Sequence, residues 1–282
     1  MLGVSRQVYY RRKRSIAWRK ERAAKVIKMV QELRLIMPRI GTRKLYHLLK
    51  VQLRALKVGR DMLFRILKAN HMLIKPKRNY HVTTNSHHRF RKHKNLIEHI
   101  DLVHPEQVWV SDITYVGTRD NPMYLALVTD AYSKKIVGYD LSNSLAVDSS
   151  IKALKLAIKN RTYKNKPLIH HSDRGLQYCS DQYQEILSKS EIRCSMTQSY
   201  DPYANAVAER VNGILKAEFI GYNRKLKLRV MNQLVKNSIR IYNEIRPHYS
   251  AYYRTPNQMH KQSEIIIRTY KKTKYQQSYD CW

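Results

Sequence analysis

Three carboxylates in the middle of the chain occupy positions that suggest chemistry. Asp112 interrupts a run of apolar and β-branched residues, and a strand interior is a costly place for a lone carboxylate unless a metal ion or a donor meets it. Asp173 lies at the end of the predicted strand 168–171, and sites form at the carboxyl ends of strands in open α/β sheets. Glu209 falls in a helical stretch at about 205–220. A shared role requires that this helix pack beside the ends of the two strands, because an Asp at a strand end is by itself usually a cap or turn residue.

The segments around these acids predict a mixed sheet covered by helices. Runs rich in β-branched and aromatic residues predict five strands, at 108–116, 124–130, 135–141, 168–171 and 192–196. Apolar residues at helical spacing predict helices at 151–158, 181–187, 205–220 and 230–245. Three strands in quick succession form a meander, and the later strands are joined by crossover helices, so we expect an α/β fold with helices on both faces.

The N-terminal part predicts short basic helices separated by tight turns. Apolar spacing predicts helices at 17–37, 43–53 and 62–70, with Pro38 ending the first and Gly41-Thr42 offering a cap to the second. This pattern is typical of a small helical DNA-binding module, such as a helix-turn-helix, over residues 1–74. The alternative is a basic helical hairpin that only packs on the core.

Domain boundaries follow from changes in composition along the chain. We expect a basic linker at 75–104, because its Lys and Arg residues stand among Thr, Asn, Ser and His without clean periodicity. The predicted catalytic core spans 105–222, and a basic helical extension spans 223–282.

The charge of the chain is unevenly distributed. The 282 residues carry a formal net charge of +33, which favours a polyanion as partner. Residues 1–100 hold 27 basic and 4 acidic side chains, residues 101–220 hold 14 of each, and residues 221–282 hold 13 and 3. A ribosomal or histone-like protein would be basic throughout, so this pattern indicates a neutral catalytic body delivered to nucleic acid by its flanks. The alternative is that the flanks are merely solvated basic surface.

Cysteine and apolar patterns exclude several classes of protein. Cys179, Cys194 and Cys281 form no CxxC pair, so neither a disulfide scaffold nor a cysteine-rich zinc site is indicated, and a reducing cytoplasm fits. The chain shows no apolar stretch long enough for a membrane span and no secretory h-region near its start, so we expect no membrane partner. His170 and His171 could suggest zinc, but neighbours in a strand point to opposite faces.

Several motifs, in order along residues 30–260, resemble one family. Asp173 and Glu209 are separated by 35 residues, and Lys216 follows Glu209 by seven. The motifs are the runs Trp109–Tyr115, His171–Tyr178 and Ala208–Lys216, the upstream segments Pro38–Leu49 and Asp61–Leu73, and the closing Tyr242–His248 with Thr255-Pro256. Together they resemble the insertion-sequence transposases encoded by two overlapping reading frames, which have a DDE core of the retroviral-integrase type on a ribonuclease H-like fold.

The resemblance implies a metal-dependent polynucleotidyl transferase. It implies that Asp112, Asp173 and Glu209 hold Mg²⁺ or Mn²⁺, two ions in all, with Asp112 bridging both and the other two acids each closing one side. It also implies cleavage of element ends and strand transfer, in which a first joining between the element's own ends gives a circular intermediate. We expect Lys216 to face DNA and contact a phosphate, together with the other expected nucleic-acid contacts Arg43, Arg60, Arg246 and His248.

The resemblance also raises questions about completeness and partners. Gln198-Ser199 and Ala204 differ from the residues common in the family's loop before the glutamate helix, and Gly3–Tyr10 looks like the middle of a longer family protein. A partner segment from an upstream reading frame is therefore expected, as are double-stranded DNA and a homo-oligomer assembled on it, in the bacterial cytosol. The alternative functions are a ribonuclease H-like nuclease or resolvase that cuts without joining, and a non-catalytic transposase-derived DNA-binding protein.

Overall fold

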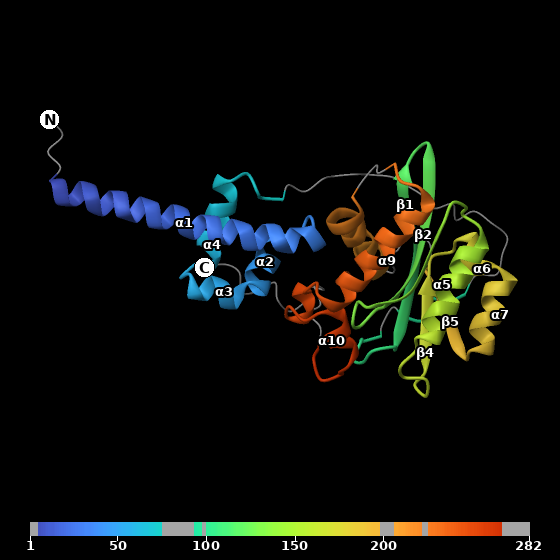
Figure 1. Cartoon of the computed structure of the whole chain (residues 1–282). Coiled ribbons are helices and arrows are strands. Elements are labelled where there is room, and N and C mark those ends of the chain that lie inside the picture. Colours follow the sequence, from blue (N-terminus) through green and yellow to red (C-terminus); the bar gives the residue numbers. More distant parts are fainter. Residues whose placement is uncertain (1–4, 75–92, 98–99, 198–205, 222–224, 267–282) are drawn as a thin grey trace, which may run out of the picture. The chain divides into compact units, whose positions relative to one another are not determined.

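A computed structural model of the chain describes residues 5–74, 93–97, 100–197, 206–221 and 225–266 (Figure 1). The chain divides into two compact units, one of residues 1–81 with 217–221 and the other of residues 82–216 with 222–282. The first part of the predicted linker, 75–92, and the unusual loop positions Gln198, Ser199 and Ala204 lie outside the described residues. Among the described helices, none is both long enough and apolar enough to cross a membrane.

The first unit is a small helical module. Its helices are α1 (Arg6–Ile36), α2 (Thr42–Leu48), α3 (Lys50–Ala55) and α4 (Arg60–Ala69). Their buried apolar side chains form its core and include Val26, Val30, Leu45, Leu53, Leu63 and Leu67. Residues 217–221 also belong to this unit, where Lys44 Nζ donates to Glu218 Oε1 over 2.6 Å. The basic helical module predicted from the sequence is thus present as helices.

Several helix boundaries in this unit differ from the sequence prediction. Helix α1 begins at Arg6 and not at 17, because the Ser5 side chain accepts a hydrogen bond from the Val8 N–H and caps a first stretch that has no apolar stripe. Gly41, not Thr42, is the N-cap of α2, and Thr42 is buried inside the helix. The predicted single helix at 43–53 is broken at Leu49 into α2 and α3.

The second unit contains the predicted five-stranded sheet. Its strands are β1 (Val108–Thr118), β2 (Asn121–Asp130), β3 (Ile136–Ser142), β4 (Leu168–Ser172) and β5 (Ile192–Met196), in the order β3-β2-β1-β4-β5. The first three strands form an antiparallel meander, whereas β4 pairs with β1 and β5 in parallel. The mixed sheet predicted from the sequence is therefore confirmed, and β1 lies at its centre.

Helices cover both faces of this sheet (Figure 1). One face packs on α5 (Val147–Lys159), α6 (Leu176–Cys179) and α7 (Asp181–Lys189), around Trp109, Leu154 and Tyr183. The opposite face packs on α8 (Ala206–Ile214), around Val110, Ile169 and Ala208. A π-helix, η1 (Leu215–Ile220), continues α8 directly. Side chains alternate between the faces of a strand, so Asp112 shares the α8 face with Val110.

Close approach fixes α5 against β3, and a C-terminal segment completes the unit. A Cβ at Gly138 would lie 2.1 Å from the Ala153 carbonyl oxygen, so no larger residue fits there without moving α5. The remaining elements are α9 (Leu228–Glu244), η2 (Tyr249–Ala251) and α10 (Pro256–His260). The Asn243 side chain bonds both the N–H and the carbonyl of Ile136, which ties α9 to β3.

A buried group of ionisable side chains joins α10 to the sheet. The Glu106 carboxylate accepts hydrogen bonds from the backbone N–H groups of Thr162 and Tyr163, and lies 3.3 Å from His260 Nε2. The Asp130 carboxylate accepts from the Glu106 N–H over 2.6 Å. Burial acts to raise the pKa of Glu106, but the hydrogen bonds from His260 and the two backbone groups outweigh it and lower that pKa. These acids are therefore satisfied within the fold.

Candidate active site

Asp112 lies in the middle of the central strand with a hydrogen-bond donor in front of it. Its backbone pairs with Leu127 of β2, and its side chain is on the face that α8 covers. The Asn212 side-chain amide on α8 donates to Asp112 Oδ2 over 2.7 Å. Asn212 is 3% exposed, and within the described residues its Oδ1 has no hydrogen-bond partner. A buried amide thus holds one oxygen of the carboxylate in place.

Asp173 is brought beside Asp112 by the register of two parallel strands. Ser111 pairs with Ser172 in parallel, so Asp112 and Asp173, which follow them directly, lie at the same end of this paired segment. Asp173 Oδ1 then accepts a hydrogen bond from the Gly175 N–H over 3.0 Å, which closes a tight turn. A Cβ at Gly175 would lie 3.0 Å from that oxygen, so the turn has little room for a side chain.

The other two acids, Asp173 and Glu209, both influence the pKa of Asp112. Burial is the largest cause that raises the pKa of Asp112, to about 7, and the charges of Asp173 and then Glu209 raise it further. The hydrogen bonds from Asn212 and from the Ile113 N–H only partly oppose this shift. The charges of Asp173 and Glu209 thus act against ionisation of Asp112, which a bound cation would favour.

Helix α8 and the π-helix after it present two further charged groups to this region. Glu209 is exposed near the start of α8. Lys216 lies on η1 and is half-buried; burial lowers its pKa, whereas the Asp112 charge raises it. The lysine is therefore near enough to Asp112 for the two charges to interact, and its expected contact with a DNA phosphate stays a prediction. A π-helix is rare and occurs frequently at functional sites.

The donor set suits a hard divalent cation. Carboxylate oxygens are the ligands that Mg²⁺ prefers. The groups that act on the Asp112 carboxylate are two other carboxylates, an amide and a backbone N–H, and not sulfur or imidazole. Within the part of the chain that the structure describes, no three His, Cys, Asp or Glu side chains are grouped closely enough to hold an ion. A three-ligand site formed by Asp112, Asp173 and Glu209 therefore stays a prediction.

The histidine pair on β4 takes a structural role on each face. His170 Nε2 lies 2.7 Å from Ser111 Oγ and 2.9 Å from Tyr183 Oη, whereas His171 Nδ1 lies 2.8 Å from Ser195 Oγ. Both rings are fully buried. The two side chains point to opposite faces, as the alternation of a strand predicts.

The expected DNA contacts fall into two groups. Arg43 and Arg60 are exposed on the helical module, where Arg60 also pairs with Asp61 over 2.8 Å. Arg246 and His248 are only 2% and 7% exposed, and their side chains lie 2.9 Å apart. The expectation that these two contact DNA is therefore wrong for this structure, because their polar groups are enclosed beside Tyr242, where they pack the segment after α9.

Sequence reasoning did not single out Asn212 as a site residue. The signal was present, because a polar residue stands three positions after Glu209 and four before Lys216, on one side of an otherwise apolar helix. Asp181 lies in the first turn of α7, whose N-cap is Ser180, and the Ser180 side chain accepts from the Tyr183 N–H.

Comparison with known proteins places this geometry in a family. Two models of an integrase core domain match the chain, one over residues 103–202 and the other over residues 190–256. An uncharacterized 31 kDa protein of insertion element IS600 from Shigella sonnei is 38% identical over 168 residues, which is 59% of this chain and 61% of that protein. The transposase of insertion sequence element IS904 from Lactococcus lactis is 31% identical over 59% of this chain and 66% of its own length.

A third relative and a solved structure agree with this placement. The transposase InsF of insertion sequence IS3A from Escherichia coli is 35% identical over 51% of this chain and 50% of its length. The match thus spans less than two thirds of each of these relatives. A simian T-cell lymphotropic virus intasome structure is similar in fold, with a TM-score of 0.50 and 20% identity over 78% of this chain and 75% of that chain. The chain therefore matches the integrase core domain and is similar to proteins of insertion sequences, among them transposases.

Proposed function

We propose that this protein is a DNA transposase that cuts the ends of a mobile element and joins the exposed 3′-hydroxyls to another phosphodiester. The observation that carries the proposal is the buried Asp112, whose pKa is raised by burial and by the charges of Asp173 and Glu209, within a match to the integrase core domain. Cleavage is a hydrolysis, in which water forms one P–O bond while the bond to the 3′ oxygen breaks. Joining is an exchange, in which the 3′ oxygen forms a P–O bond as another breaks, so no further energy source is needed.

Each residue has a definite part in this proposal. Asp112 would bridge two Mg²⁺ or Mn²⁺ ions, with Asp173 and Glu209 each completing one side. When bound, such ions stabilise the negative charge that builds up on the attacking and leaving oxygens. Asn212 orients Asp112 through its 2.7 Å hydrogen bond. Lys216, with its point charge near Asp112, would hold a phosphate close to the carboxylates.

The proposed partners follow from the charge of the chain and from its relatives. Double-stranded DNA is the proposed substrate, both as element ends and as target, because the flanking segments carry most of the +33 net charge. Arg43 and Arg60 remain proposed contacts, since both are exposed on the helical module. We further propose a homo-oligomer on DNA, a partner segment from an upstream reading frame, and action in the bacterial cytosol.

An end-processing assay tests the function. Labelled duplexes that carry the element's terminal sequence are incubated with the protein, with and without Mg²⁺, and both cleaved and joined products are measured. The proposal expects both products, and only with the metal ion. Cleavage without any joined product would instead identify a nuclease or resolvase, and binding without either product would identify a DNA-binding protein that has lost catalysis.

A further inference from the structure

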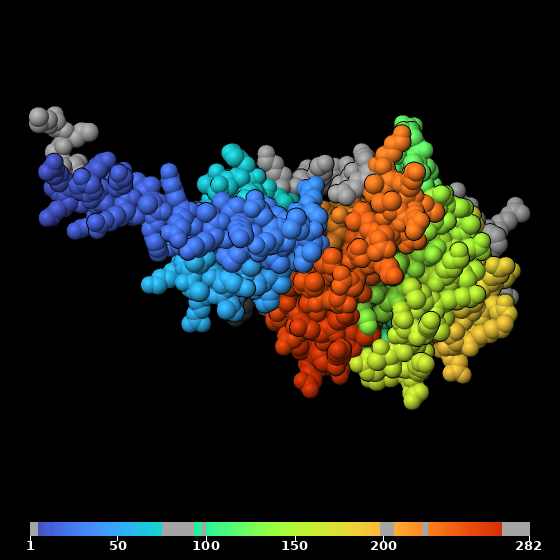
Figure 2. Space-filling view, viewed as in Figure 1, coloured from blue at the N-terminus to red at the C-terminus, as the bar shows by residue number. Residues whose placement is uncertain are grey.

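The first half of α1, the longest helix that the structure describes, packs on no other helix of its own unit. Helix α1 contributes only Val26 and Val30 to the buried core, and both lie in its later part. Of residues 6–20, here called the basic arm, all are exposed except the half-buried Ser15. Figure 2 shows the beginning of α1 bare, whereas the other helices of the module gather along its later turns.

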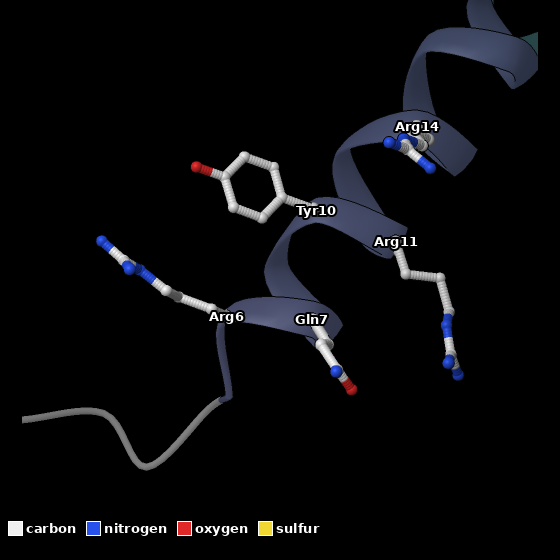
Figure 3. A pocket seen from close by; sticks show the side chains of 5 residues that line it. All are labelled: Arg6, Gln7, Tyr10, Arg11 and Arg14. Atoms are coloured by element: carbon white, nitrogen blue, oxygen red, sulfur yellow. The ribbon is translucent and has the colours of Figure 1, made fainter.

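The basic arm is charged on every side. It holds seven Lys and Arg residues and no acidic residue. Arg11, Arg12, Lys13 and Arg14 are consecutive, and at 3.6 residues per turn four consecutive positions surround the helix. In Figure 3 the side chains of Arg6, Arg11 and Arg14 project outwards in different directions. A packed partner helix needs an apolar stripe on one face, which this distribution does not leave.

Large aromatic side chains stand exposed among these charges. Tyr9, Tyr10 and Trp18 are 58%, 55% and 52% exposed. The guanidinium of Arg22, one turn further along the helix, lies 4.1 Å from the centroid of the Trp18 ring. Interleaved basic and aromatic side chains suit a surface that carries both phosphates and flat apolar groups.

We infer that the basic arm is a DNA-reading helix that lies in the major groove of duplex DNA, with phosphates on both of its sides. The groove is about 12 Å wide, which admits a helix of about 10–12 Å diameter. A helix charged all round meets both phosphate strands that border the groove, whereas a helix lying on the surface of the duplex would leave half of its charge in solvent. At about 1.5 Å per residue, the arm is about 22 Å long.

This inference deepens the proposed function and rests on it, because it assigns DNA binding to an element distinct from Arg43 and Arg60. It also excludes a second copy of the chain as the arm's partner. Two arms that pack side by side would bring fourteen positive charges together, twice the seven that each arm holds, with no acidic residue within either arm to offset them.

The test compares two variants of the full chain that lose the same charge. In the arm variant, Arg11, Arg12, Lys13 and Arg14 are each changed to Gln, which has similar helix propensity. In the control, Lys152, Lys155, Lys159 and Lys164 are changed to Gln; these are exposed on and after α5, which covers the sheet face opposite α8. Affinity for a labelled duplex is measured by fluorescence anisotropy in EDTA, from about 50 to 200 mM salt.

The expected result is a change in the salt dependence of binding. Each lost phosphate contact lowers the slope of log affinity against log salt by about 0.9, so the arm variant should lose roughly 3 to 4 units of slope and the control less than about 1. Equal slopes for the two variants overturn the inference. So does a change in the sedimentation coefficient of the DNA-free arm variant, which would show that the arm binds a second copy. Because EDTA removes catalysis from the measurement, a protein that fails to cleave can still pass this test.

Discussion

The sheet unit holds two clusters of acids that differ in how their charge is balanced. Around Asp112, burial and the charges of Asp173 and Glu209 raise the pKa of that acid, and one amide and one lysine only partly compensate. Around Glu106 and Asp130, every described carboxylate oxygen meets a backbone N–H, a hydroxyl or His260. The first cluster raises the pKa of an acid, and the second lowers one.

This difference separates acids kept for chemistry from acids kept for the fold. A satisfied buried acid stabilises the protein, so its removal should be costly. An unsatisfied group of acids costs stability until a ligand arrives, which is typical of functional sites. We therefore expect that removing the charge of Glu106 lowers stability, whereas removing the charge of Asp112 raises the stability of the metal-free protein.

The largest effect on stability is expected at the satisfied cluster. Glu106→Gln leaves the size of the side chain unchanged but removes the charge that His260 and two backbone N–H groups meet, and breaking a buried pair of this kind costs about 3 kcal/mol or more. Urea unfolding measures the loss. The control is Glu185→Gln, an exposed residue paired with Lys189 on α7, which should change stability by about 0.5 kcal/mol or less. An equal loss of stability in the two variants would contradict the claim that the buried contacts of Glu106 stabilise the fold.

Asn212→Leu should reduce activity strongly while leaving the fold intact. The change removes the donor that orients Asp112, and a small misplacement of a catalytic group can cost about 100-fold in rate. Stability should hardly fall, because an amide oxygen without a partner is buried at this position. Single-turnover cleavage and thermal unfolding are measured together, with Asn237→Leu on the exposed face of α9 as control. Near-parent cleavage by the Asn212 variant would show that the amide only fills space.

Asp112→Asn should stabilise the metal-free protein at high pH. The pKa of Asp112 is raised above its unfolded value to about 7, so the ionised group costs folding stability as pH rises toward and past 7. The gain in EDTA should reach on the order of 1–3 kcal/mol at about pH 8 and shrink as pH falls toward about 3, where the acid is mostly protonated in both states. A variant less stable than the parent at high pH would contradict the account of this cluster.

His260 should show the reverse dependence on pH. Although burial lowers its pKa, the contacts with Asp130 and Glu106 raise it overall. A raised pKa means that the stabilisation is fully present below the unfolded value of about 6.5 and is lost as pH rises through the folded value. The stability difference between parent and His260→Gln should therefore be larger at about pH 6 than at about pH 9. A difference independent of pH would mean that the imidazole is neutral throughout.

The sequence predicted the elements of the sheet unit better than the contacts between them. Period and composition place Asp112 on a strand, Asp173 after one and Glu209 on a helix, because these signals are local. The pairing of Glu106 with His260 joins residues 154 positions apart and leaves no such signal. For the same reason Arg246, a surface residue by composition, is buried in the fold.

Helix boundaries show the same limit at shorter range. The sequence predicts that α1 starts at 17, because residues 6–16 have no apolar stripe. The helix nevertheless starts at Arg6, because an exposed helical segment needs no such stripe. The π-helix after α8 also escaped prediction, since its residues fit an ordinary helix equally well. What the sequence could supply was the order of the motifs, and the comparisons confirm the family that this order indicated.

The most direct test of the central claim is the rate of Mg²⁺-dependent cleavage of labelled element-end DNA by Asp112→Asn, Asp173→Asn and Glu209→Gln. Each change keeps the size of the side chain and removes a charge needed to hold a divalent ion. The control is Asp181→Asn, an exposed residue in the first turn of α7, which should cleave at the parent rate. The account predicts that all three variants, shown to be folded and to bind DNA, lose both cleavage and joining, and that a double variant is scarcely worse than a single one. Cleavage near the parent rate by any one of the three would contradict it.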